Sequence, residues 1–489
     1  MANFGGMERA EAEAIYDAGR EACVEFLVSM IGAHRRLEER VRVLEAKGGA
    51  SSRNSSVAPS ADIASTRQQR RALARAKAKE LLEKDGEPRK QGGQGGHRGA
   101  GRGLLGEDQM SEIVDHYPSE CSGCAHEFTD QEKVPRYGAG RHQVAELPPI
   151  TVFYVEHRTQ CLRCPGCRKR TRGTLGAVGE SAFGPALHAA LVTLTARNRI
   201  SRRDLSELAG ELFGVGISVG AIDRVCQRAS ALLAGPHEQL SAQVLASGAI
   251  NVDETGWFRA GENRSMWTAA TADAVIFQIV ADRHRDRLIE LLGESFHGIV
   301  TSDRWWAYDL LDPEQRQACW SHLQRDWRSH SEGLAAQKAF GEAGLAMTGR
   351  IFQAWHAFAE HQDRSRLNRE MKPIQNELRE LLEHAANGSK RHRLHCRFAK
   401  NLLKIWPALW TFLTIPGVTP TNNAAERALR GPVIHRRLSY GNQSDDRERF
   451  TERSLSASVT CRLQHRSLHH YLSQLFTTHQ HGGALPALT

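Results

Sequence analysis

The sequence predicts a multidomain protein whose largest part is a mixed α/β core with a helical insertion. Its 489 residues exceed the length at which a single hydrophobic core stops growing, roughly 250 to 300 residues. Five of the ten cysteines gather between Cys121 and Cys167, ahead of that core. After Gly248 the apolar pattern changes from helical spacing to short strand-like runs. We therefore expect small helical and metal-binding units first and an α/β core after them.

The composition favours a polyanionic partner and gives no sign of a membrane segment. The formal net charge is +9 and the isoelectric point is about 9.1. The chain has no run of about 18 apolar residues, and it does not begin with a secretory signal. We expect a cytoplasmic protein without a membrane partner.

Residues 1–50 are expected to form a helical segment. Between residues 20 and 46, Met30, Leu37 and Leu44 recur every seven residues, which is the spacing of a short coiled coil. An amphipathic helix packed on its own chain is the alternative. The coiled coil favours a homodimer or a higher oligomer.

Residues 51–108 are expected to be a flexible basic arm rich in Gly and Ser. From Arg67 to Arg102 there are eleven Lys and Arg against four Asp and Glu, and the span ends in KQGGQGGHRGAGRG. Such a segment buries little apolar surface and can neutralise phosphates, with Arg98 as a candidate DNA contact. A solvated linker is the alternative reading.

Residues 109–180 are expected to form a zinc-binding domain. CSGC supplies Cys121 and Cys124, and CLRCPGC supplies Cys164 and Cys167, so that four thiolates can surround one structural Zn²⁺. Cys161 or His126 could replace one of these ligands. Reduced structural thiols without a metal are the alternative, and a disulfide framework does not suit the cytoplasm.

Residues 181–240 are expected to form a helix-turn-helix-like domain. SRRDLSELAGELFGVGISVGAIDRVCQRAS reads as an amphipathic helix, a glycine-bearing turn and a second helix opened by Ser218. The second helix could enter a major groove, and Arg202 and Arg203 are candidate DNA contacts. A helical hairpin that does not touch DNA is equally compatible with the pattern.

Residues 241–450 are expected to form the α/β core. AINVDETGWFRA, SMWTAATA and AVIFQIVADR read as three strands, DRLIELLGES as a helix and HGIVTSD as a buried strand. This order predicts a mixed sheet with its antiparallel part first. Residues 335–413 read as a helical insertion, and residues 451–489 as a C-terminal helical segment.

Three acids of this core could meet around a metal. Asp253 lies within the first strand, and since side chains alternate between the faces of a strand, only one of Asp253 and Glu254 can point to a given site. Asp303 follows the GIV strand, where α/β proteins place their chemistry, although it could simply cap a helix. Glu426 follows Asn423 by three residues, which also matches a helix capping box.

The chain resembles the DDE transposases of the insertion-sequence-sixty-six family over nearly its whole length. The resemblance rests on the order and spacing of several stretches. They are SSRNSSVAPSAD, QGGQGGHRG, EHRTQCLRCPGC, VDETGW, SDRWWAYDLL, ACWSHLQR, NNAAERALR and HRRLSYGNQS.

The resemblance implies an RNase-H-like catalytic domain with Asp253, Asp303 and Glu426 as its catalytic triad. These residues would hold two Mg²⁺ (or Mn²⁺) ions, with Asp253 bridging both. The implied reaction is metal-dependent cleavage and strand transfer of double-stranded DNA, at the terminal inverted repeats of the element and at a target. Small accessory proteins from the same element are the further partners it implies.

Other residues near the triad are candidates for secondary roles. Asn422 and Asn423 could position Glu426 or contact phosphate, and His322, in a C-x2-H pair with Cys319, could serve the active site or be an ordinary core histidine. Four arginines are candidate DNA contacts or surface charges, namely Arg427, Arg430, Arg436 and Arg437. Two rival functions stay open: a non-catalytic zinc and helix-turn-helix regulator, and a metal-dependent nuclease that does not join DNA.

Overall fold

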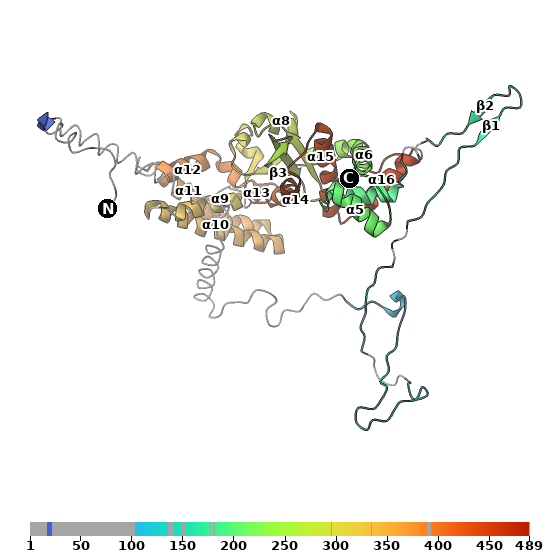
Figure 1. Cartoon of the computed structure of the whole chain (residues 1–489). Helices are drawn as coiled ribbons and strands as arrows, with labels where there is room; N and C mark the ends of the chain where they lie inside the picture. The colour runs from blue at the N-terminus through green and yellow to red at the C-terminus, as the bar shows by residue number, and fades with distance from the viewer. Residues whose placement is uncertain are drawn as a thin grey trace. The chain divides into compact units, whose positions relative to one another are not determined.

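The computed structural model of the chain is shown in Figure 1. It describes residues 17–21, 103–134, 140–148, 150, 152–176, 178, 181–294, 296–333, 335–388 and 393–488. The predicted coiled-coil helix, apart from residues 20 and 21, and the basic stretch 67–102 with Arg98 lie outside these residues. The chain divides into one unit of residues 64–153 and a second unit of all other residues.

A five-stranded mixed sheet forms the centre of the larger unit, with the strand order β5-β4-β3-β6-β7. The strands are β3 (Ala249–Arg259), β4 (Glu262–Ala270), β5 (Val275–Val280), β6 (Ile299–Ser302) and β7 (Arg316–Ala318). β3, β4 and β5 pair antiparallel, and β3, β6 and β7 pair parallel. The mixed sheet with its antiparallel part first is thus confirmed, and α8 (Arg285–Leu292) forms where a helix was expected. The three-residue β7 was not predicted.

The two faces of the sheet carry different side chains because strand residues alternate. Ile250 and Val252 of β3 are buried on one face together with Val300 of β6 and the leucines of α8. Met266 and Phe277 are buried on the other face, against α14 (Asn423–Ser439) and α15 (Asp445–Leu463). Asn251 and Asp253 alternate with Ile250 and Val252 along β3, so their side chains point toward the face that α14 covers.

The edge strand β5 is covered by α15 through unusually direct hydrogen bonds. The backbone amides of Val275 and Phe277 donate to the hydroxyls of Thr460 and Ser456, each over 3.0 Å, and that of Ile279 donates to the carboxyl of Glu452. These acceptors recur every four residues and so share one helix face. An exposed strand edge is thereby satisfied. α15 also spans residue 450, where the sequence suggested a boundary.

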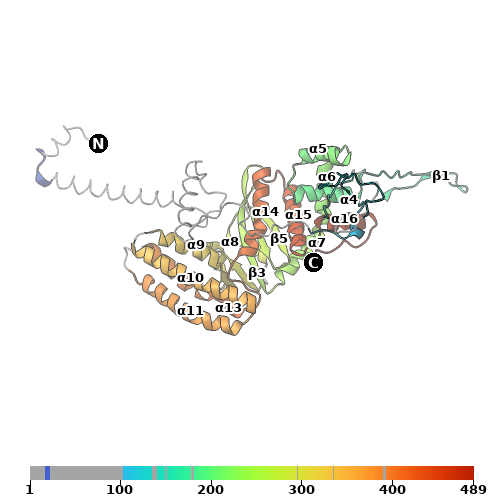
Figure 2. The same cartoon turned by 90° about the horizontal axis from the view of Figure 1, so that it is seen from below.

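A helical layer packs beside β6 and β7. Its helices are α9 (Trp320–Ser331), α10 (Ala335–His361), α11 (Arg364–Ala386), α12 (Arg393–Lys404) and α13 (Thr411–Thr414), with 3₁₀ turns at η4 (Trp306–Leu310), η5 (Pro313–Gln315) and η7 (Trp406–Leu409). Figure 2 shows α9, α10 and α11 lying side by side. Their core is aromatic, with Trp320 and Trp327 almost fully buried. The predicted insertion is helical throughout its described residues.

Four helices that precede the sheet in the chain form one core with α15 and with the C-terminal helix α16 (Leu468–Gln480). The four are α4 (Pro185–Ala196), α5 (Arg202–Phe213), α6 (Val219–Leu232) and α7 (Ala234–Leu245). α5 ends at Gly214, whose φ of 63° lies in the left-handed region that favours glycine, and the Ser218 side chain caps α6. The helix-turn-helix-like pair therefore forms as a helical hairpin. Among the described residues no helix combines the length and apolarity needed to cross a membrane.

We expect Gly344→Ala to destabilise the protein by about 1–3 kcal/mol, because a methyl group at this position of α10 would lie 2.2 Å from the ring of Trp327. The measurement is the unfolding midpoint in denaturant. Gly349→Ala, on the exposed side of the same helix with nothing within 4 Å, is the matched control and should be neutral or slightly stabilising. Equal effects of the two changes would contradict the packing described for α9 and α10.

Candidate functional site

Asp253 and Asp303 lie on neighbouring parallel strands. β3 pairs with β6 so that Asn251 lies beside Thr301. Asp253 follows two residues later within β3, and Asp303 follows one residue after the end of β6. Asp253 pairs with Thr268 on β4, between Met266 and Ala270, which are buried against α14 and α15. The alternation therefore points the Asp253 carboxyl toward the helix that carries Glu426.

The protonation equilibria show that the acids act on one another. Burial and the charges of Glu254, Asp303 and Glu426 raise the pKa of Asp253 well above its usual range. Burial and the charge of Glu254 raise the pKa of Asp303 to about 6. Burial also raises the pKa of Glu426, against the influence of Arg325, Arg430 and Arg427. Such a group of acids with raised pKa values is typical of functional sites.

Asn422 ties the start of α14 to β3. Its side-chain amide donates to the Val252 carbonyl over 2.7 Å and its side-chain oxygen accepts from the Asn251 amide over 3.1 Å, across about 170 residues of sequence. Asn422 is 0% exposed, so its contacts match the predicted positioning of Glu426 and leave no surface for phosphate. The prediction that its side chain contacts DNA is therefore wrong in this conformation, because β3 uses that side chain fully.

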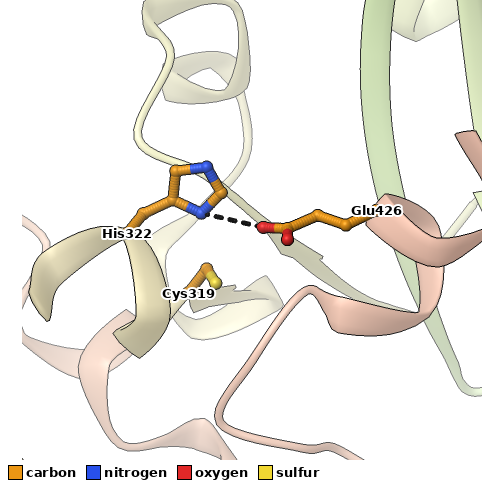
Figure 3. Close-up of side chains that lie close together, drawn as sticks. All are labelled: Cys319, His322 and Glu426. Atoms are coloured by element: carbon orange, nitrogen blue, oxygen red, sulfur yellow. Dashed lines mark ion pairs between the residues drawn. The ribbon is translucent and has the colours of Figure 1, made fainter. Parts of the chain in front are cut away.

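The carboxylate of Glu426 faces His322 and Arg325. Its Oε1 lies 3.4 Å from His322 Nδ1 and 3.5 Å from a guanidinium nitrogen of Arg325. Figure 3 shows His322 and Cys319 on one side and Glu426 reaching them from α14. In the described part of the chain, the one His, Cys, Asp and Glu group close enough to hold a metal is Cys319, His322 and Glu426, all within 4.8 Å of one another. The three predicted triad carboxylates do not form such a group in this conformation.

Glu254 is a functional-site neighbour that the sequence did not single out. Its carboxylate is buried, accepts from the Tyr308 hydroxyl over 2.7 Å and pairs with Arg283. Its charge contributes to the raised pKa values of both Asp253 and Asp303. Nothing in the sequence around Tyr308 indicated that its hydroxyl would donate to Glu254. Glu254 points to the opposite face from Asp253, in agreement with the predicted alternation.

The comparison with protein families decides the identity of the chain. The model described as Transposase IS66 family matches residues 180–448, more than half of the sequence, and includes the three acids. The chain belongs to the IS66 transposase family. A second model, described as Family of unknown function (DUF6444), matches residues 7–103 of this transposase. No curated protein matches the chain. Membership places the chain among DNA-processing enzymes.

The arginines predicted to bind DNA have different surroundings in this IS66-family chain. Arg436 donates to the Gly256 carbonyl and to Thr255, and Arg202 pairs with Asp223 over 2.9 Å, so both are engaged within the protein. The other predicted contacts are exposed. They are Arg203, Asn423, Arg427, Arg430 and Arg437. These five stay predicted DNA contacts.

A basic cleft of about 620 Å³ lies between the start of α5 and the loop after α14. Four arginines line it, namely Arg199, Arg202, Arg203 and Arg447. Asp204 and Asp223 are the acids nearby, and Asp223 already pairs with two of these arginines. Burial and the charges of Arg199 and Arg202 lower the pKa of His435, at the wall of the cleft, to about 4. The cleft therefore carries an excess of positive charge.

The tryptophans of the transposase separate into two groups. Trp257 is fully buried and its indole N–H donates to Asn442, so it belongs to the core. Trp305 and Trp306 lie two and three residues after Asp303 and are 36% and 45% exposed, with the guanidinium of Arg283 over the Trp305 ring. An exposed aromatic pair beside an acidic site can stack on bases.

The two Cys-x-x-Cys turns have the same local backbone structure. In each, the first cysteine's carbonyl accepts from the residue four positions on, Ala125 or Arg168, and both residues have φ near 60°. Backbone N–H groups directed at the sulfur lower the pKa of Cys121 and of Cys164. Cys164 and Cys167 join β1 (Cys161–Arg163) to β2 (Arg170–Arg172). Cys121 and Cys124 belong to the smaller unit, and their shared Zn²⁺ stays a prediction.

We expect Asp303 to contribute more to the stability of the metal-free protein as the pH falls from 7 toward 4, because its pKa is raised to about 6 in the folded state. A raised pKa contributes stability that is complete below the unfolded value and is lost as the pH rises through the folded value. Asp303→Asn should therefore be more stable than the wild type at pH 7, by at most about 3 kcal/mol. The asparagine keeps the oxygen that accepts from the Trp305 amide.

The measurement is the unfolding midpoint between pH 4 and pH 8 with a chelator present. Asp312→Asn is the control, since Asp312 also caps a 3₁₀ turn but lies outside the acid cluster. A wild type and an Asp303→Asn variant with the same pH profile would show that Asp303 does not titrate with folding.

Proposed function

We propose that this transposase binds the ends of its insertion sequence and catalyses metal-dependent cleavage and strand transfer of DNA with Asp253, Asp303 and Glu426. The observation that carries the proposal is the position of the three acids, which are separated by 50 and 123 residues in sequence. The strand β3, which carries Asp253, pairs in parallel with β6, which ends one residue before Asp303. Asn422, at the start of the helix that carries Glu426, donates a hydrogen bond to Val252 of β3. No ordinary requirement of folding gathers like charges in this way.

The topology supports an RNase-H-like catalytic core. Three antiparallel strands are followed by two parallel ones, with β3 in the centre carrying the first acid. The second acid follows the neighbouring parallel strand, and the third lies in the first turn of a helix that packs on the sheet. This is the arrangement that the family resemblance implied from the sequence.

The acid cluster fits divalent magnesium in part. Asp253 and Asp303 offer hard carboxylate oxygens, the ligands that Mg²⁺ prefers. Their pKa values are raised, so a nearby cation would stabilise their ionised forms. Glu426 acts on Asp253 electrostatically while its carboxylate faces His322. Bound Mg²⁺ or Mn²⁺ would supply activation of the attacking oxygen and stabilisation of the leaving oxygen.

The chain's own residues have separate roles in this proposal. The raised pKa values of Asp253 and Asp303 shift both carboxyls toward the protonated form in the absence of a cation, and a bound cation would favour their ionised, ligating forms. Asn422 fixes the start of α14 on β3, and Glu426 lies in the first turn of that helix. Arg427 and Arg430 are exposed beside Glu426 and bind the DNA backbone.

We assign the basic cleft to the DNA backbone as well. Positive charge in a concave surface concentrates phosphate and makes affinity depend strongly on salt. The matched Cys-x-x-Cys turns support one structural Zn²⁺ on Cys121, Cys124, Cys164 and Cys167, because N–H groups directed at sulfur stabilise thiolates. A homodimer remains the expected assembly for holding two element ends.

We expect Asp253→Asn to abolish cleavage and joining of DNA that carries the element ends, by at least about 100-fold, while DNA binding persists. The assay follows nicked and joined products with Mg²⁺, and a gel shift follows binding. Asp446→Asn, a change of an exposed acid at the start of α15, is the control and should retain activity.

The wild type also separates the rival functions. A protein that binds the ends without metal-dependent cutting is a regulator, and one that cuts without joined product is a nuclease. Unchanged strand transfer in Asp253→Asn would exclude Asp253 from the catalytic triad.

We expect loss of Arg199 and Arg203 to weaken DNA binding and to make it less dependent on salt. Each lost phosphate contact should reduce the slope of log affinity against log salt by about 0.9. Binding of the Arg199→Ala/Arg203→Ala protein is measured across a salt series. Arg369→Ala, on the exposed face of α11, removes a positive charge outside the cleft and serves as the control. A double variant with an unchanged slope would exclude the cleft as a phosphate site.

A further inference from the structure

We propose that Cys319, His322 and Glu426 form a second metal site, selective for a Zn²⁺-like transition ion, which holds Glu426 away from the magnesium ligands. Cys319 is the residue before α9, His322 lies three residues later in its first turn, and Glu426 lies in the first turn of α14. The first two share one face of the helix start because of their spacing. Figure 3 shows that all three side chains converge.

The distances between the ligand atoms fit a zinc ion. Tetrahedral bonds of zinc to nitrogen, oxygen and sulfur place pairs of ligand atoms roughly 3.3 to 3.6 Å apart. His322 Nδ1 and Glu426 Oε1 are 3.4 Å apart, and all three ligand atoms lie within 4.8 Å of one another. Small side-chain movements therefore complete three corners of a tetrahedron, and water can take the fourth.

The same two atoms make no hydrogen bond in the described part of the chain. His322 Nδ1 and Glu426 Oε1 are both buried, and the nearest cation to the carboxylate is the guanidinium of Arg325 at 3.5 Å. Their separation is long for a charge-assisted hydrogen bond, which is about 2.7 to 2.9 Å. Leaving buried polar atoms without a partner costs free energy, and a shared cation would remove this cost.

The cysteine is prepared for a metal by its neighbours. The backbone N–H of Asn422 donates to Cys319 Sγ over 3.1 Å, and the N–H groups of Ser321 and His322 are directed at it as well. Such donors stabilise a metal-bound thiolate, although burial raises the pKa of the free thiol to about 11. Burial lowers the pKa of His322 to about 3, so the imidazole is neutral and free to coordinate.

The charges of the ligands balance those of a divalent ion, although four arginines lie nearby. Arg325 and Arg304 face His322, and Arg427 and Arg430 act on Glu426, which opposes a cation. A thiolate and a carboxylate within the site neutralise the two charges of the metal.

The ligand types separate this site from the magnesium site. Sulfur and imidazole nitrogen suit Zn²⁺ and Co²⁺, whereas Mg²⁺ takes oxygen ligands. Glu426 is shared, and one carboxylate facing His322 cannot also complete the Asp253 and Asp303 set. The transition ion would therefore inhibit the magnesium-dependent reaction, a consequence that rests on the proposed function, whereas the binding itself does not.

The test is a titration of the metal-free full chain with Co²⁺, followed by absorption and by bound metal per chain. We expect His322→Ala to lose one equivalent of Co²⁺ and to weaken the corresponding affinity by more than the roughly 10- to 100-fold cost of losing an outer-shell partner. Cys319→Ser should lose part of the sulfur-to-cobalt charge-transfer absorption. Cys461→Ser, another buried cysteine, is the matched control and should leave the spectrum unchanged.

The four predicted zinc cysteines bind in all of these proteins, so only the difference between variants reports on the new site. Equal Co²⁺ stoichiometry in the wild type, His322→Ala and the isosteric Glu426→Gln overturns the proposal. If His322→Ala does not fold, the loss of sulfur-to-cobalt absorption in Cys319→Ser decides the outcome, because Cys319 belongs to the new site alone. A wild type that binds the extra Co²⁺ but never cleaves DNA upholds the site and refutes the proposed function, and an active enzyme without the extra ion does the reverse.

Discussion

The parallel pairing of β3 with β6 is the constraint on which the candidate site depends. It brings the end of β6, which Asp303 follows, to the strand that carries Asp253, and the charge of Asp303 disfavours the ionised form of Asp253. The protein tolerates this because the sheet is held elsewhere, through α15 on the β5 edge and through aromatic packing beside β7. In the proposed function, a bound cation would offset this unfavourable interaction between the acids.

The third acid reaches the site through the helical insertion. After β7 the chain makes a layer of helices before it returns at α14, so no local regularity links Glu426 to the strands. The connection is made instead by Asn422, whose hydrogen bonds to Asn251 and Val252 fasten the returning chain one residue before Asp253. The tryptophan-rich core of the helical layer holds α9 in position, which brings His322 of this helix close to Glu426 of α14.

The sequence predicted those features that depend on local pattern. β3, β4, β5, β6 and α8 follow from apolar periodicity, and the alternation along β3 correctly separated Asp253 from Glu254. β7 is only three residues long and carries buried Arg316 and Gln317, so its sequence has no strand signal. For Asn422 the sequence left open a role in positioning Glu426 or a contact with phosphate, because its hydrogen-bond partners lie about 170 residues away. The convergence of Glu426 with Cys319 and His322 is likewise a tertiary contact that spacing cannot show.

The position of Glu426 gives the site two alternatives that differ in chemistry. Toward Asp253 and Asp303 it would complete a set of oxygen ligands, and toward Cys319 and His322 it completes a set of sulfur, nitrogen and oxygen ligands. In the proposal Asn422 holds the start of α14 on β3 in both arrangements, and the side-chain torsions of Glu426, whose energy differences are small beside metal-binding free energies, would select between them. The identity of the available metal can therefore decide which arrangement is populated, without any change of fold.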